Sequence, residues 1–129
     1  MTDLLTEQEE ARLRQEVSNL TAVEILEINM LEQSLGITPI DTLTIKLSLD
    51  RSPKKNWVDK VGGLPKYIEE VAESLHRKRG MTISRAIATA ISRIKVWARG
   101  GGGVDPDTQA KAAKALAEWE AKKARSRAS

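Results

Sequence analysis

The chain contains one histidine, His76, which stands beside three cations, Arg77, Lys78 and Arg79. A general base must lie close to the substrate proton that it removes, and a charged, exposed helix end is a poor place for one. A zinc site would need further ligands at suitable spacing, and the chain has no cysteine. We therefore expect no catalytic residue and no metal site, with His76 on the surface near a helix C-terminus, where positive charge is favourable.

Glutamates and glycines are the next residues whose types could serve chemistry. Glu69, Glu70 and Glu73 fall on one predicted helix, whereas the paired carboxylates of a glycoside hydrolase flank the bond that is cut. We expect a solvated helix face instead. The glycines at 62–63 and 100–103 lack the flanking residues of a phosphate-binding loop, so they predict a turn and a hinge. We expect no cofactor and no enzymatic activity.

Basic residues remain as candidates for binding. The predicted helix over residues 84–99 carries Arg85, Lys95 and Arg99 roughly opposite its apolar stripe. The candidate contacts to a nucleic acid or to a protein partner are Arg85, Arg93, Lys95, Arg99, Lys122, Lys123, Arg125 and Arg127. A basic patch is sufficient for salt-dependent binding to nucleic acid, but a solvated helix face has the same sequence pattern.

Charge divides the chain into two parts. Residues 1–50 hold 10 acidic and 3 basic residues, a net charge of −7, whereas residues 51–129 have a net charge of +10. A polar segment with a proline, 51–56, lies at the change in composition. We therefore expect an acidic helical segment over residues 1–52 and a basic module over 53–129, with different environments or partners. We also expect residues 54–124 to fold alone.

Helices account for almost all of the sequence pattern. Thr6 with Glu9 and Thr21 with Glu24 fit capping boxes. The second box precedes an apolar stripe that ends at Gly36 and consists of Ile25, Ile28, Leu31 and Leu35. Residues 38–50 are ambiguous, because a proline-containing helix start overlaps a strand-like alternation. We favour a helix there, since a lone strand would have to pair with its own copy in a dimer.

The basic part predicts three further helices. The first is opened by Pro65 and closed by Gly80, the second is capped by Thr82 or Ser84, and the third begins at residues 105–106. The basic tail over residues 122–127 is expected to be frayed. Trp97 and Trp119 lie on apolar helix stripes, so we expect them in the core and not stacked on bases. The predicted fold is all-α, with acidic helices followed by a basic three-helix module.

A set of short motifs runs through the basic part: NWV at residues 56–58, GGLPKYI at 62–68, AIA at 86–88, KVWA at 95–98 and AEWE at 117–120. In this combination, residues 54–124 resemble an uncharacterised helical module of tailed-bacteriophage proteins, found alone or appended to virion and head-morphogenesis proteins. The resemblance transfers no catalytic residue. It implies a phage setting, a role in assembly or binding, phage structural proteins as partners, and a place in the host cytoplasm or the virion.

A second resemblance comes from pattern alone. The alternation over residues 42–49, followed by a helix ending at Gly80 and the segment 81–87, is similar to a ribbon-helix-helix repressor. In that fold Thr44, Lys46 and Ser48 would face DNA bases. The additional residues 51–63 and the helix after residue 105 do not fit it. DNA binding therefore stays the alternative function, and a homo-oligomer remains open.

Membrane insertion is not expected. No stretch approaches the ~20 apolar residues that span a bilayer, and the first residues lack the features of a secretory signal. We expect the protein to stay in the compartment where it is made.

Overall fold

The computed structural model describes residues 6–35 and 65–128, and within these ranges every regular element is helical. The elements are α1 (Glu7–Ser18), α2 (Ala22–Leu35), α4 (Lys66–Arg79), α5 (Ile83–Ala98), the short 3-10 helix η2 (Gly101–Gly103) and α6 (Pro106–Ala128). The all-α prediction is confirmed. Gly36, the ambiguous stretch 38–50 and the segment 51–56 lie outside the described residues. None of the described helices combines the length and apolar character needed to cross a bilayer.

The helix ends follow the capping signals in the sequence. Thr6 accepts a hydrogen bond from the Glu9 amide while the Glu9 carboxylate accepts one from the Thr6 amide. Thr21 and Glu24 make the same reciprocal pair at the start of α2. Helix α4 ends at Gly80, whose φ of 71° places it in the left-handed region that favours glycine. These contacts satisfy backbone groups that a helix end leaves unpaired.

The glycine run forms a compact turn between α5 and α6. A Cβ at Gly101 would lie 2.7 Å from Val96 Cγ1 and 3.0 Å from the Val96 carbonyl oxygen, so only glycine fits there without a shift. Helix α6 then starts at Pro106, as predicted. The prediction that residues 122–127 are frayed is wrong for the backbone, because α6 continues to Ala128.

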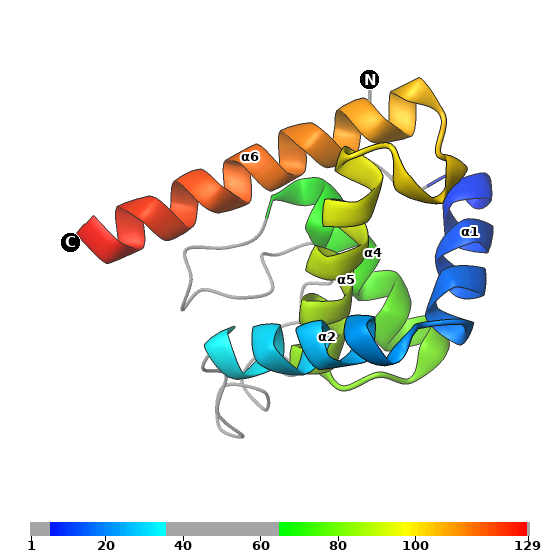
Figure 1. The fold of residues 1–129 in the computed structure, drawn as a ribbon, viewed down its shortest axis with the longest axis horizontal. Helices are drawn as coiled ribbons and strands as arrows, with labels where there is room; N and C mark the ends of the chain where they lie inside the picture. Colours follow the sequence, from blue (N-terminus) through cyan, green and yellow to red (C-terminus); the bar gives the residue numbers. More distant parts are fainter. Residues whose placement is uncertain (1–5, 36–64, 129) are drawn as a thin grey trace.

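Helix α5 is the centre of the molecule. Figure 1 shows α5 upright in the middle, with α6 running across its upper end, α2 across its lower end and α1 at the side. Helices α4, α6 and α2 all pack directly against α5. The core is made of Ile, Leu, Ala and Val side chains together with Tyr67, Trp97 and Trp119. Both tryptophans are buried, which confirms their predicted place in the core.

One hydrophobic cluster includes residues from both parts of the chain. Leu13 of α1 and Ile28 and Leu35 of α2 belong to the same cluster as the apolar residues of α4, α5 and α6. The division of charge near residue 52 is therefore not a division of the core. The acidic helices α1 and α2 and the basic helices α4, α5 and α6 share one hydrophobic core.

Candidate functional site

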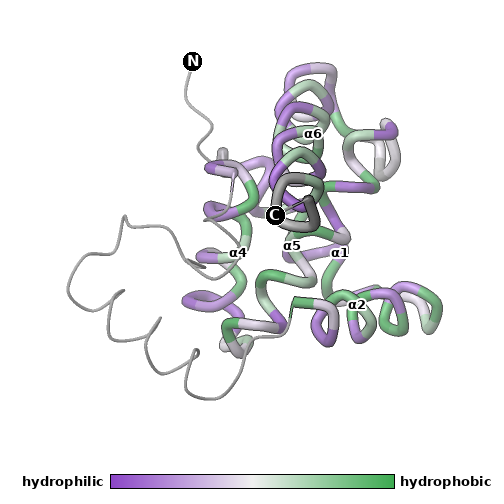
Figure 2. Tube along the Cα trace, turned by 90° about the vertical axis from the view of Figure 1, so that its left-hand side faces the viewer, coloured by the Kyte–Doolittle hydropathy of each residue, from purple (hydrophilic) through white to green (hydrophobic). Residues whose placement is uncertain are grey.

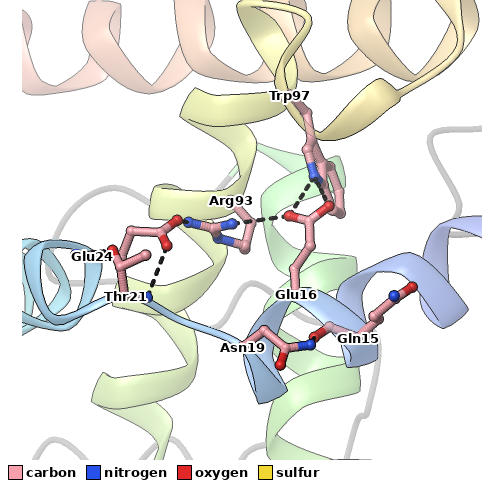
Figure 3. Close-up of polar contacts among 7 residues, drawn as sticks. All are labelled: Gln15, Glu16, Asn19, Thr21, Glu24, Arg93 and Trp97. Carbon is pink, nitrogen blue, oxygen red and sulfur yellow. Dashed lines mark hydrogen bonds and ion pairs between the residues drawn. The ribbon is translucent and has the colours of Figure 1, made fainter.

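Arg93 lies at the centre of a cluster that joins α5 to both acidic helices (Figure 3). Its side chain is only 4% exposed. One guanidinium nitrogen donates to Glu16 of α1 at 2.9 Å, and the other donates to Glu24 of α2. The indole Nε1 of Trp97 donates to the same Glu16 carboxylate at 3.1 Å. A buried charge needs such partners, because taking it out of water is costly.

Glu9 forms a second cluster, between α1, α4 and α6. Its nearly buried carboxylate accepts hydrogen bonds from Tyr67 Oη at 2.9 Å, from Thr108 Oγ1 at 2.7 Å and from Lys111 Nζ at 2.9 Å. The Lys111 ammonium also lies 5.0 Å from the centre of the Tyr67 ring, within the range of a cation–π contact. These donors hold the carboxylate in its charged form.

The pKa values in these clusters follow from the contacts. Burial raises the pKa of Glu9, but the hydrogen bonds from Lys111, Thr6, Thr108 and Tyr67 outweigh burial and hold that pKa below its usual range. Burial, with the neighbouring Glu9 charge, raises the pKa of the Tyr67 phenol. The Thr21 amide and then Arg93 lower the pKa of Glu24. The carboxylates of Glu9 and Glu24 are therefore ionised at neutral pH.

Further charge pairs link the two parts of the chain at their edges. Lys78 of α4 donates to Glu10 of α1 at 2.5 Å, and this contact lowers the pKa of Glu10. Arg85 of α5 donates to Asn29 of α2 and lies 3.9 Å from the Glu32 carboxylate. The acidic residues of α1 and α2 thus neutralise basic residues of α4, α5 and α6. We expected the two charges to indicate separate partners, but many of these groups pair with one another.

The candidate contact residues that the structure describes differ widely in exposure. The expectation that Arg93 is a surface contact is wrong, because its side chain is buried and paired with Glu16 and Glu24. Arg85 is half-buried against α2, Lys95 is half-buried, and Arg99 is exposed at the C-terminal cap of α5. Lys122 and Lys123 are half-buried on α6, and only the backbone is described for Arg125 and Arg127, which continue that helix.

The histidine and the glutamates considered for catalysis make contacts within the fold. His76 lies in the last turn of α4, as predicted, and is half-buried with Nδ1 2.8 Å from the Met81 carbonyl oxygen. Glu69 is buried, which corrects the expectation of a fully solvated glutamate face. Glu73 pairs with Arg77 one turn later at 3.2 Å. In the described part of the chain, no three His, Asp or Glu side chains gather as a metal site would require.

The outer face of α2 was not singled out from the sequence. Val23, Leu26 and Met30 are 73%, 62% and 71% exposed, and their spacing places them on one side of the helix. The opposite side buries Ile28 and Leu35 against the body, whereas Ile25, expected on that buried side, is 39% exposed. Figures 1 and 2 place α2 at the edge of the described part of the molecule. The sequence signal for this exposed face is a second apolar stripe on the helix, formed by Val23, Leu26 and Met30.

Comparison with models of protein families, with curated proteins and with solved structures found no match for this chain.

Proposed function

We propose that this protein is a non-enzymatic binding protein of tailed-phage virion assembly, and that the outer face of α2 binds a head or tail structural protein. The observation that supports this proposal is the exposed stripe of Val23, Leu26 and Met30. Large apolar side chains exposed together on one element are typical of interaction sites. The phage setting rests on the motifs of residues 54–124, and the binding role rests on this face.

The size of the face suits a single helix of a partner. Three side chains exposed to this degree present on the order of 300–400 Å² of apolar surface, within the size range of patches that are often functional on monomers. A standard interface buries ~800 Å² on each partner, so this stripe alone is too small for a large rigid interface. Spacing of three and four residues is also the spacing by which one amphipathic helix packs against another.

Charge indicates the chemistry of that partner. Helix α2 contains three glutamates and no lysine or arginine, and no basic residue lies in its last turn. Glu24 and Glu32 face basic residues of α5, whereas Glu27 is exposed next to the apolar stripe. The complementary surface is therefore an amphipathic helix with lysine or arginine beside its apolar side chains. A second copy of α2 would bring the same acidic character and lacks this complement.

The test is purification of the tagged protein from host cells infected with the phage that encodes it. We expect a head or tail structural protein to co-purify with the wild type, and its amount to fall at least tenfold for Leu26→Asp, because a charge would have to be buried in the contact. Ala113→Asp is the matched control, since it adds the same charge at an exposed position of α6.

Two outcomes would contradict the proposal. In the first, the structural protein co-purifies equally with the wild type and with Leu26→Asp, which would remove the α2 face from the interaction. In the second, Leu26→Asp only converts a dimer into a monomer, measured by light scattering after gel filtration, which would identify a second copy as the occupant. Circular dichroism of each variant verifies that α2 and the core are retained.

A further inference from the structure

Helix α1 is attached to the rest of the molecule in an unusual way. It has 12 residues, and among them only Leu13 is a buried apolar side chain. A helix this short is marginal in water without tertiary contacts. Its most buried contacts come from Glu9, Leu13 and Glu16, which recur at spacings of four and three residues and therefore share one face.

The surface that receives this face is built by three helices. Tyr67 of α4 and Thr108 and Lys111 of α6 hold the carboxylate of Glu9. Arg93 and Trp97 of α5 hold the carboxylate of Glu16, about two turns further along α1. The side chain of Leu13 is buried between these two positions. This receptor surface, defined by Tyr67, Arg93, Trp97, Thr108 and Lys111, recognises a helix with the pattern Glu-x3-Leu-x2-Glu.

Three open surface grooves border α1. A hollow of about 300 Å³ lies between α1 and α4, lined by Leu13 and Leu75 among others. Another of about 410 Å³ lies between α1 and α6, and a third of about 430 Å³ lies where α1 meets α2 and α5. Elements with few buried apolar contacts open most easily, so α1 is the described helix best suited to leave its place.

An empty receptor surface would be costly. Departure of α1 would leave Arg93 with one carboxylate in place of two and would remove the acceptors of Trp97 Nε1 and Tyr67 Oη. Buried donors without acceptors cost free energy, so the surface favours refilling by a helix that supplies the same carboxylates. A second copy of this chain supplies identical groups.

We propose that the receptor surface binds α1 in trans as well as in cis, and that two copies of this chain form a dimer by exchanging their α1 helices. Exchange conserves every contact of Glu9, Leu13 and Glu16. Only the connection to α2, residues Asn19, Leu20 and Thr21, has to change its path. Exchange of an identical element is a low-cost route to dimers. This proposal concerns a different surface from the outer face of α2 and does not depend on a phage partner.

The test uses the absence of cysteine from the natural chain. One full-length version carries Glu10→Cys on α1, and a second, with a different tag, carries Ser74→Cys on α4. The natural side chains of these positions meet at 3.2 Å. In mixtures of the two versions, a short bis-maleimide can join positions 10 and 74 only when α1 of one copy lies on the body of the other. Replacing Ser74→Cys by Ala121→Cys, at an exposed site in the C-terminal half of α6, gives the background.

We expect a cross-linked heterodimer that increases with total concentration and exceeds the Ala121→Cys background. Glu16→Gln added to the Glu10→Cys version removes the ion pair with Arg93, and exchange should become about tenfold faster, because a hydrogen bond to a charged group is lost. Circular dichroism verifies that this variant is folded. No product above background at any concentration, with or without Glu16→Gln, would overturn the proposal. Binding of a labelled peptide of residues 6–19 without heterodimer formation would also overturn it, and would indicate a foreign acidic helix as the partner.

Discussion

Trp97 combines apolar burial with a polar contact, and both parts can be tested. Its side chain is fully buried, its ring centre lies 6.4 Å from that of Tyr67, and its indole donates to Glu16. Trp97→Ala should lower the free energy of unfolding by about 3–5 kcal/mol, as other large-to-small changes in cores do. Urea denaturation at pH 7 measures the change. Trp97→Phe keeps most of the volume and should cost less, and a loss below about 1 kcal/mol for Trp97→Ala would be typical of surface sites.

The carboxylates of α1 and α2 should make stability depend on pH. The pKa values of Glu9, Glu10 and Glu24 are lowered in the folded protein, so the folded state binds fewer protons than the unfolded state in acid. Their contribution is present above the unfolded pKa of about 4.3 and is lost as the pH falls through the lower folded values. Urea denaturation from pH 7 to pH 3 should show this loss.

Glu9→Gln isolates the largest of these networks, since it keeps the side-chain size and removes the charge. We expect a loss of roughly 1.5–3 kcal/mol at pH 7, the typical contribution of a hydrogen bond to a charged group, and a shallower decline in acid. Glu118→Gln, at an exposed position of α6, is the control. An unchanged pH profile for Glu9→Gln would mean that this carboxylate does not link folding to protonation.

For single residues, the sequence predicted those roles that depend on neighbours within the same helix. The burial of Trp97 followed from its helix stripe, and the capping role of Glu9 followed from its distance to Thr6. The second role of Glu9 did not follow, because its partners Tyr67, Thr108 and Lys111 are 58, 99 and 102 residues away. Helical periodicity placed Arg99 opposite the apolar stripe and Arg93 at its edge, but it did not show that Arg93 would be buried against the acidic helices. Their surroundings are set by how the helices pack.

Among the elements, the turn between α5 and α6 depends on one glycine. Gly101→Ala should destabilise the protein by about 1–3 kcal/mol, because the added methyl group overlaps Val96 and the turn must shift. Thermal denaturation measures the change. Gly80→Ala provides the comparison, since no atom lies within 4 Å of a Cβ there and only its positive φ opposes the change. Combining Gly101→Ala with Val96→Ala should recover part of the loss if the overlap is the cause.

Sequence periodicity and capping residues predicted the extent of one helix, but periodicity did not predict the buried side of another. Helix α5 matches its predicted extent within one residue, because an N-cap threonine and the glycine run mark its ends. Helix α2 has apolar residues on two sides, so its periodicity could not decide which side is buried. The position of α5 against α2 selects the side of Ile28 and leaves the side of Met30 exposed.

The shared core changes what we expect of the fragment 54–124. In the fragment, Arg93 loses both carboxylates and the face of α5 that α2 covers becomes exposed. We expect a helical circular dichroism spectrum but a broad, non-cooperative melt, in contrast to a cooperative melt for the full chain. A sharp transition in the fragment would instead support the two units predicted from charge and composition.

For the whole molecule, intramolecular pairing of charges leads us to expect little binding to nucleic acid. Arg85, Arg93 and Lys111 already face carboxylates, and the acidic helices reduce the positive field. We expect weak binding to duplex DNA, with a dissociation constant on the order of 10⁻⁴–10⁻⁶ M at physiological salt, as for non-specific binders. Fluorescence anisotropy over a salt series measures it.

Arg99→Glu, at an exposed site, should weaken this binding equally for all sequences, because phosphate contacts carry no sequence information. Arg93→Glu is unsuitable for this test, since it would place a third carboxylate beside Glu16 and Glu24 in a buried site. Tight and sequence-selective binding, altered by Lys46→Glu, would instead support the ribbon-helix-helix alternative.

The distance along the chain between Glu9 and its partners also sets an order of events during folding. Helices α4 and α5 are adjacent in sequence and pack closely, so their contacts form at a small entropic cost. The contact between Glu9 and Lys111 closes a loop of about a hundred residues and requires α6 to be in place. We therefore expect α1 to dock after the transition state of folding has been passed. Glu16→Gln should accelerate unfolding in stopped-flow experiments and leave the refolding rate nearly unchanged.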